Sequence, residues 1–297
     1  MIRKIINIIP AFFFTMIALV SCTAPIDINT RDSEPVIVIY GIITDEYKYQ
    51  YIRITSSSPY FDEKANLAIL NAKVSVTSST GDKILFIGEK DGYYISEKLF
   101  EGIPGVTYHL EVEVDFNNDG FTEIYEAETT IHPVVPFDSV DITLIDIMGY
   151  RHFSLNLYMY EPPETDNYYL FKFFINDSLS NNMISEFIVT EDEMYNGAYM
   201  SGISLYYFED ATDEKNLTAP NADVENDYFV YPGDKIRLQV LNIEKGYYNF
   251  INECISEKYG ENPFFGGPPS NITTNLSNGA IGYFSGYCIQ EKNTIVP

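Results

Sequence analysis

The chain has 297 residues, and its 43 acidic side chains outnumber the 18 basic ones, so its formal net charge is −25. Because nucleic-acid binding needs positive charge that displaces counterions from the phosphates, this composition excludes it. A disordered acidic tail is excluded as well, since 45% of the residues are hydrophobic and 15% are aromatic.

The first residues have the composition of an export signal. Arg3 and Lys4 form a short basic region, and an apolar run follows over residues 5–20. A transmembrane helix needs about 20 clean apolar residues, whereas this run is shorter and contains Pro10. The segment therefore predicts a lipoprotein-type signal peptide at residues 1–21.

The end of this segment predicts a lipid anchor. Residues 19–22 are Leu-Val-Ser-Cys, which resembles the bacterial lipobox, where a signal peptidase cuts before a diacylated cysteine. We predict that Cys22 is lipidated and that residues 22–35 form a tether to a membrane. The alternatives are an uncleaved anchor or an ordinary secretory signal with a chance cysteine.

Seven short strands are predicted between residues 36 and 133. β-branched and aromatic residues dominate them, and turn residues such as Asp91-Gly92 separate them. Seven strands over about 100 residues predict an immunoglobulin-like or transthyretin-like β-sandwich. The predicted strands cover residues 36–43, 50–55, 72–78, 83–87, 93–96, 107–114 and 124–131.

Tyrosines gather around the first predicted hairpin. They are Tyr47, Tyr49, Tyr51 and Tyr60. A tyrosine offers a large rigid face and a polar tip, which suits sugars or protein partners, so we predict a binding surface here. The alternative is that these aromatics form strands and fill the core.

Residues 115–126 fit the spacing of a calcium loop. Counted from residue 115, side-chain oxygens fall at positions 1, 3, 5 and 12, and a glycine falls at position 6. Both flanks have strand patterns, which argues against an EF-hand, so we favour a solvated hairpin loop whose turn is made by residues 118–120. The alternative is Ca²⁺ clipped into the hairpin. The four predicted ligands are Asp115, Asn117, Asp119 and Glu126.

A proline-rich segment at residues 133–136 predicts a domain boundary. Beyond it, residues 134–297 predict a second β-rich module, a sandwich or a barrel, with one amphipathic helix over residues 243–259. The clearest strands cover residues 138–147, 150–160, 168–175 and 235–243. The predicted apolar face of the helix consists of Tyr247, Phe250, Ile251, Cys254 and Ile255.

Two cysteines remain downstream of the lipobox. Cys254 and Cys288 form an even pair in a chain predicted to be exported, which favours a disulfide between them. The alternative is two buried free thiols that pack as small hydrophobic side chains. A metal site is not favoured, because no histidine or third cysteine lies near either one in the sequence.

Short motifs occur in a fixed order along the chain. They are Gly-Ile-Ile-Thr-Asp at 41–45, Asn-Ala-Lys-Val at 71–74, Asp-Gly-Tyr-Tyr at 91–94, a Gly-x-x-Gly-x-x-Tyr turn at 102–108 and Gly-Ala-Ile-Gly-Tyr-Phe at 279–284. The ordered set resembles domain-of-unknown-function family 4249, lipobox lipoproteins of Bacteroidota. The resemblance implies an outer-membrane lipoprotein that serves a TonB-dependent transporter barrel, and it carries over no catalytic residue.

The sequence contains no catalytic constellation. It has three histidines, in strand patterns or before a proline, and no Gly-x-Ser-x-Gly segment. We therefore predict a non-catalytic, lipid-anchored binding accessory of an outer-membrane transporter, on the cell surface. The periplasmic face is the alternative orientation. The alternative functions are a surface adhesin or glycan-binding structural lipoprotein, and a hydrolase of surface polymers.

Overall fold

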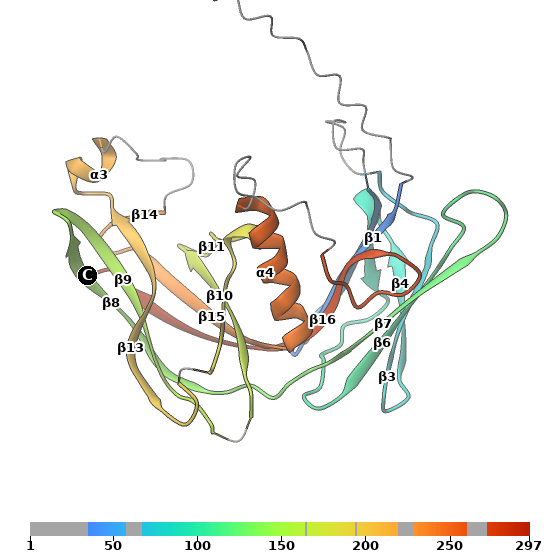
Figure 1. The fold of residues 1–297 in the computed structure, drawn as a ribbon, viewed down its shortest axis with the longest axis horizontal. Coiled ribbons are helices and arrows are strands. Elements are labelled where there is room, and N and C mark those ends of the chain that lie inside the picture. The colour runs from blue at the N-terminus through green and yellow to red at the C-terminus, as the bar shows by residue number, and fades with distance from the viewer. Residues whose placement is uncertain (1–34, 58–66, 164, 194, 219–227, 260–271) are drawn as a thin grey trace, which may run out of the picture. The chain divides into compact units, whose positions relative to one another are not determined.

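The computed structural model describes residues 35–57, 67–163, 165–193, 195–218, 228–259 and 272–297. Within these ranges the protein is mainly β, with one twelve-stranded sheet and one four-stranded sheet (Figure 1). The predicted mainly β fold class is confirmed. The predicted signal peptide, Cys22 and Tyr60 lie outside the described residues, as does the tether except for its last residue.

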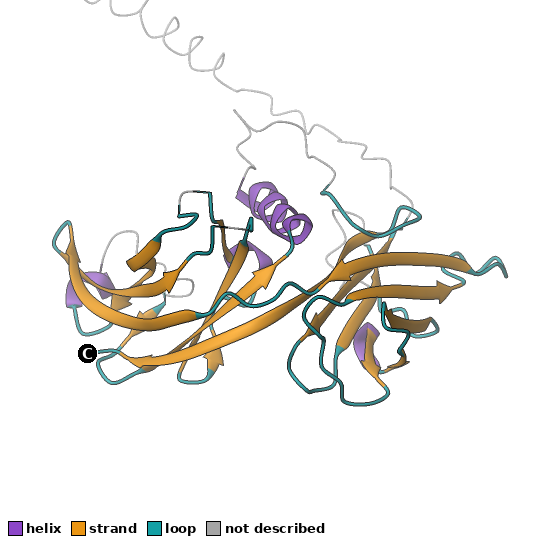
Figure 2. Ribbon diagram, turned by 90° about the horizontal axis from the view of Figure 1, so that it is seen from below, coloured by secondary structure: helices purple, strands orange, loops and turns teal. Residues whose placement is uncertain are grey.

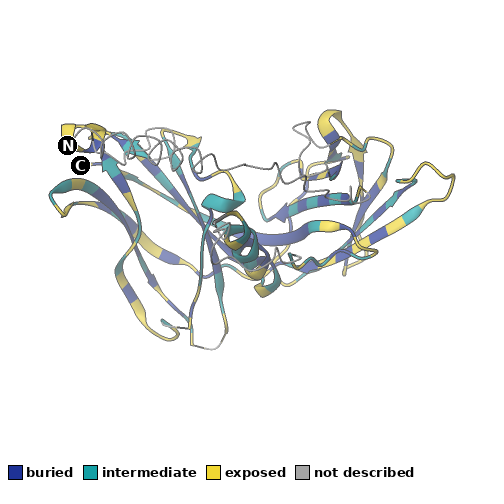
Figure 3. Ribbon diagram, turned by 45° about the horizontal axis from the view of Figure 1, so that its top comes forward, coloured by how far each residue is buried: buried dark blue, intermediate teal, exposed yellow. Residues whose placement is uncertain are grey.

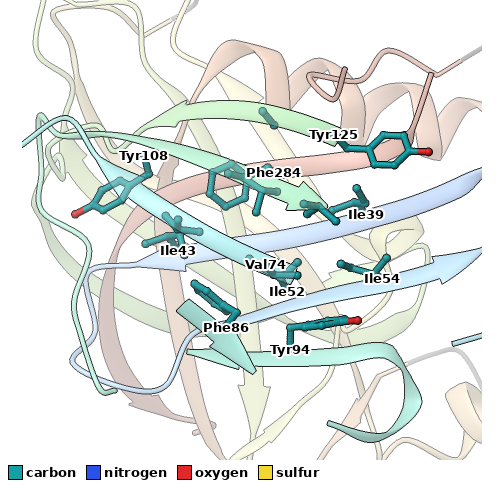
Figure 4. Packing of buried hydrophobic residues seen from close by; sticks show 14 of the residues in the cluster. Ile39, Ile43, Ile52, Ile54, Val74, Phe86, Tyr94, Tyr108, Tyr125 and Phe284 are labelled. Carbon is teal, nitrogen blue, oxygen red and sulfur yellow. The ribbon is translucent and has the colours of Figure 1, made fainter. Parts of the chain in front are cut away.

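The first seven strands begin and end within one residue of the predicted positions. They enclose one buried cluster (Figure 4), to which Phe284 and Cys288 of the last strand, β16 Ile281–Ile295, also contribute. The predicted immunoglobulin-like sandwich agrees with this arrangement of strands about a single core. The strands are β1 Ile37–Thr44, β2 Tyr51–Ser56, β3 Lys73–Ser78, β4 Lys83–Gly88, β5 Tyr93–Ser96, β6 Thr107–Val114 and β7 Glu123–Thr130, with a 3-10 helix at Lys90–Gly92.

The Gly-x-x-Gly-x-x-Tyr segment at residues 102–108 forms a turn that leads into β6. The Ile103 backbone N–H donates to the Tyr108 hydroxyl at 2.9 Å. Gly105 lies between them with φ +82, a conformation that glycine adopts without strain. The tyrosine therefore ties the loop to the start of the strand.

The predicted second module, residues 134–297, contains the four predicted strands and five further strands that the sequence patterns did not predict. Its helix α4 Lys245–Tyr259 buries Tyr247, Phe250 and Ile251, which confirms the predicted apolar face. The remaining elements are β8 Phe137–Ile147, β9 Tyr150–Tyr160, β10 Tyr168–Ile175, β11 Ser178–Leu179, β12 Ile188–Glu191, β13 Tyr199–Asp210, β14 Phe229–Val230, β15 Lys235–Ile243 and β16 Ile281–Ile295, with short helices at Ile184–Glu186 and Glu214–Thr218 (α3).

Strand β16 joins the two parts into one sheet. Its first half pairs in parallel with β1, from Val38↔Ile281 to Thr44↔Tyr287. Its second half pairs antiparallel with β15, from Asn242↔Cys288 to Lys235↔Ile295. The boundary predicted at residues 133–136 thus separates segments of sequence, but the sheet continues through both segments.

The two faces of this long sheet have different surroundings. One face packs against the core of the first seven strands and, farther along, against the four-stranded sheet of β14, β13, β9 and β8. The opposite face carries α4 over part of its length (Figure 2). Burial alternates along the strands because successive side chains point to opposite faces (Figure 3).

Candidate functional site

A groove lies on the face of the long sheet that carries α4. Its volume is about 770 Å³, within the range of roughly 300–1,000 Å³ that is usual for ligand sites. Its lining residues come from seven consecutive strands of the sheet, β11, β10, β15, β16, β1, β2 and β5, and from the β1–β2 turn. We call this site the basic groove.

The charge of the basic groove is opposite to that of the whole chain. Among the described residues that line it, four are basic and Glu46 is acidic, whereas the full chain has 18 basic and 43 acidic residues. The four basic residues are Lys48, Arg53, Lys172 and Arg237. A local excess of positive charge in an acidic protein attracts anions to this place.

Each end of the groove has an arginine stacked on an aromatic ring. The Arg53 guanidinium lies 5.2 Å from the centre of the Tyr93 ring, and that of Arg237 lies 4.0 Å from the centre of the Phe174 ring. Arg237 also pairs with Glu291 at 3.2 Å. These contacts hold the planar guanidinium groups in place, which suits them to carboxylate, sulfate or phosphate groups.

The strand register shows that the groove is elongated. Arg53 pairs with Tyr40, which pairs with Tyr283 of β16, whereas Arg237 pairs with Asn293 of β16. Tyr283 and Asn293 are ten residues apart on β16, so the two arginines are separated by roughly 33 Å along the direction of that strand. The groove follows this diagonal across the sheet.

Lys172 lies toward the Arg237 end of the groove, because it pairs with Gln239, two residues from Arg237 on β15. Its ammonium group is 4.8 Å from the centre of the Phe187 ring, and within the described ranges no carboxylate is within ion-pair distance of it. Burial, reinforced by repulsion from Lys48, lowers the pKa of Lys172 to about 8. The lysine is therefore mostly charged at neutral pH, and among the described residues it has no carboxylate partner.

A buried glutamine fixes the turn that carries Lys48. The Thr44 N–H donates to Gln50 Oε1 at 3.2 Å, and Gln50 Nε2 donates to the carbonyl oxygens of Thr44 and Phe100, each at 3.2 Å. Lys48 itself forms an ion pair with Glu46. The turn at this edge of the groove is thus held by hydrogen bonds to its own backbone.

The predicted tyrosine surface lies near the groove but is not the same site. Tyr47 and Tyr49 are exposed, and neither is among the described residues that line the groove. Tyr47 instead lines a smaller cavity of about 370 Å³ beside β6. Tyr51, two residues after Tyr49, does line the groove, together with Tyr40, Tyr93 and Tyr287.

The predicted calcium loop is a hairpin tip capped by its own carboxylates. Asp115 accepts hydrogen bonds from the N–H groups of Asp119 and Gly120, at 3.1 and 3.0 Å. Asn117 Nδ2 donates to Glu123 at 2.8 Å. The described residues contain no group of three or more His, Cys, Asp or Glu side chains arranged to hold a metal ion.

Glu126 does not join the other three predicted calcium ligands. It pairs with Glu111 along β7, three residues beyond Glu123 at the hairpin tip, so it lies roughly 10 Å farther along the strand. Its carboxylate is instead 3.4 Å from His109. The structure therefore does not bring Glu126 together with the other three residues, because β7 carries position 12 of the loop away from the hairpin tip.

The predicted disulfide is not formed. Cys254 and Cys288 are both free thiols. Cys288 belongs to the core of the first seven strands, whereas Cys254 is a residue of α4 and packs on the opposite face of the sheet. Since the sheet lies between them, the alternative expectation of two separate small hydrophobic side chains describes the structure.

Burial raises the pKa of each thiol, to about 11 for Cys254 and about 12 for Cys288. Both therefore remain protonated and poorly nucleophilic at neutral pH.

None of the described helices is long and apolar enough to cross a membrane.

The fold and the groove define a mainly β protein with a basic, aromatic groove on the open face of a long sheet. The chain belongs to the family described as Domain of unknown function (DUF4249), which matches residues 23–293, and the resemblance seen in the sequence is confirmed. Among solved structures, a segment of two fibronectin type-III domains from chicken tenascin is 10% identical, with a TM-score of 0.18, over 66% of this chain and 86% of that chain. No curated protein matches the sequence significantly.

Proposed function

We propose that this chain is a non-catalytic, lipid-anchored protein of the outer membrane that holds a ligand in its basic groove for a TonB-dependent transporter. The groove is the observation that carries the proposal. It combines cations with exposed tyrosine faces. Such side chains hold ligands by charge, ring contact and hydrogen bonds.

The non-catalytic part of the proposal rests on the kinds of side chain in the groove. The described lining residues include no histidine, serine or cysteine. These residue types supply many nucleophiles and general bases. Hydrolysis of a glycosidic bond uses a pair of carboxylates, whereas Glu46 is the one acidic side chain among the described lining residues and is paired with Lys48. We therefore infer that the groove binds its ligand without converting it.

The anchoring part of the proposal rests on the lipobox and on the family. The Leu-Val-Ser-Cys segment at residues 19–22 favours acylation of Cys22. Acylation confines a protein to the membrane plane and raises its effective concentration near a membrane partner, so a weak interface with a transporter is sufficient. Cell-surface exposure is the orientation that we propose.

Mild crosslinking of the native outer membrane, followed by affinity purification of the full chain, tests this proposal. We expect a transporter barrel to copurify with the wild-type chain. The Cys22→Ser chain should appear in the soluble fraction without the barrel. If Cys22→Ser remains in the membrane, the lipid anchor is wrong.

The same purification separates the proposed function from the second candidate. A surface adhesin or glycan-binding structural lipoprotein would use the same groove without a transporter. A wild-type preparation that is anchored through Cys22 but contains no barrel would contradict the transporter role and favour the second candidate.

A further inference from the structure

The cations of the basic groove differ in how far the protein itself neutralises them. Lys48 pairs with Glu46, and Arg237 pairs with Glu291. Within the described ranges Arg53 and Lys172 have no carboxylate partner; Arg53 donates to the Asp91 carbonyl oxygen at 3.4 Å. The groove therefore presents at least two positive charges that an anionic ligand can pair with, one toward each end.

The spacing of these charges favours a chain-like ligand. Arg53 lies level with Tyr283 of β16, and Lys172 pairs with Gln239, which pairs with Glu291 of the same strand. Tyr283 and Glu291 are eight residues apart on β16, so Arg53 and Lys172 are separated by roughly 26 Å along the direction of that strand. A single small anion reaches one of the two charges, whereas an oligomer with several acid groups reaches both.

The surface between the charges favours rings. Tyr51 and Tyr93 line the groove with 47% and 41% of their surface exposed. An exposed tyrosine presents a flat apolar face with a hydroxyl at its rim. Sugar rings have apolar faces and carry their hydroxyl groups around the edge, so they fit such a surface.

An extended acidic peptide fits the groove less well. Six of the seven strands that form the floor pair with a strand on each side, so their backbone N–H and C=O groups are used within the sheet. A peptide lying on this face cannot add to the sheet as a strand. Its own amide groups would lose water and find few partners, which costs free energy.

We infer that the basic groove binds a short acidic oligosaccharide, with its acid groups on the groove cations and its ring faces on the exposed tyrosines. This inference rests on the proposed binding function and adds the class of ligand. A short ligand is favoured because the chain as a whole is acidic, so a long polyanion that extends beyond the groove meets repulsion.

Calorimetric titration of the full chain in detergent tests the inference. The probes are a galacturonate hexamer, its fully methyl-esterified neutral form and a heparin-derived hexasaccharide, with hexaglutamate as the peptide probe. We expect one or both acidic sugars to bind, at least about tenfold more tightly than the neutral ester and hexaglutamate. Failure of both acidic sugars to bind overturns the inference, as does equal binding of the ester or of hexaglutamate.

Two groove variants and one control link binding to the named residues. Lys172→Met and Arg53→Gln should each weaken binding of the acidic sugar about tenfold. Lys83→Gln removes an exposed lysine that pairs with Glu111 outside the groove, and it should leave binding unchanged. Equal losses in all three variants would overturn the assignment to the groove.

Thermal melts of the same variants show whether each remains folded. Lys172→Met keeps the length of the side chain and removes a poorly solvated charge, so its Tm should not fall. No step uses a transporter or the anchor. Failure here therefore leaves the transporter role to be judged by copurification, and failure of copurification leaves this result unaffected.

Discussion

The two faces of the long sheet are formed by the same strands but differ in their surroundings: one face is packed in the core, and the other lines the basic groove. On β1, Ile37, Ile39 and Ile43 are fully buried in the core, whereas Val38 and Tyr40 line the groove on the other side. The period of two along a strand allows this division. The comparison indicates that stability comes chiefly from one face and binding from the other, and substitutions on either face can test it.

The largest expected effect is on the core face. Phe284 is fully buried beside β1, so Phe284→Ala should lower the free energy of unfolding by about 3–5 kcal/mol. Val38→Ala, on the groove face, should lower it by about 1 kcal/mol or less. Urea unfolding of both variants measures the difference. Equal losses would contradict the division between the faces.

The second effect concerns the start of β16, where the two parts of the sheet join. Gly282 has φ +106, and a Cβ there would lie 2.1 Å from the Ile39 carbonyl oxygen. Gly282→Ala should therefore cost about 3 kcal/mol, because it adds a clash to the backbone strain.

Gly279→Ala is the matched control for that change. Its φ is +73, but no atom lies within 4 Å of the added Cβ. It should cost only about 1 kcal/mol, from the strain alone. Chemical unfolding compares the two, and similar costs would show that the close approach of β1 and β16 is not limiting.

The third effect should stabilise the fold. The pKa of Lys172 falls from 10.5 to about 8 on folding, so the folded state carries a penalty for the charge. Lys172→Met should remove that penalty and raise the free energy of unfolding by about 1 kcal/mol at pH 7, allowing for partial solvation.

The pH dependence of this effect has a defined sign. Below about pH 8 the lysine is charged in both states, and the penalty is constant. Between about 8 and 10.5 the unfolded state binds more protons, so the wild type gains stability as pH rises, and the advantage of Lys172→Met should disappear. Melts at pH 7 and pH 10 test this; an advantage that grows with pH would contradict it.

The fourth effect lies at the hairpin tip, away from both faces. Asp115→Ala removes the acceptor for two backbone N–H groups and should cost about 1 kcal/mol. The calcium prediction for this loop is tested in the same melts by adding a chelator. A lower wild-type midpoint with chelator, absent in Asp115→Ala, would support Ca²⁺, and an unchanged wild-type midpoint would contradict it.

The sequence predicted the strands that have regular periodicity and missed those that lack it. β9, β10 and β15 have the predicted bounds, because their apolar positions follow a clear pattern. β13 was missed because its pairing with β9 shifts register near Gly202 and Leu205, which breaks the period of two. β16 was missed because glycines interrupt it where it meets β1.

The groove was harder to predict than the strands. Its residues come from seven strands and a turn, and the pairing of β1 with β16 brings them together from opposite ends of the chain. One local signal was available: Lys172 interrupts the apolar strand Tyr-Tyr-Leu-Phe-Lys-Phe-Phe-Ile. Lysine side chains are mostly exposed in proteins, so a half-buried lysine in such a strand is unusual, and it marks the groove.

The smallest expected effect on stability distinguishes two tyrosines of similar exposure. Tyr51 and Tyr49 are 47% and 45% exposed, and only Tyr51 is among the described lining of the groove. Tyr51→Ser and Tyr49→Ser should each change the free energy of unfolding by less than about 0.5 kcal/mol. Tyr51→Ser should weaken binding of an acidic hexasaccharide about fivefold, from loss of one ring contact. Tyr49→Ser should bind like the wild type in the same titration. A larger loss in Tyr49→Ser would move the binding surface to the exposed β1–β2 turn, where the sequence alone had predicted it.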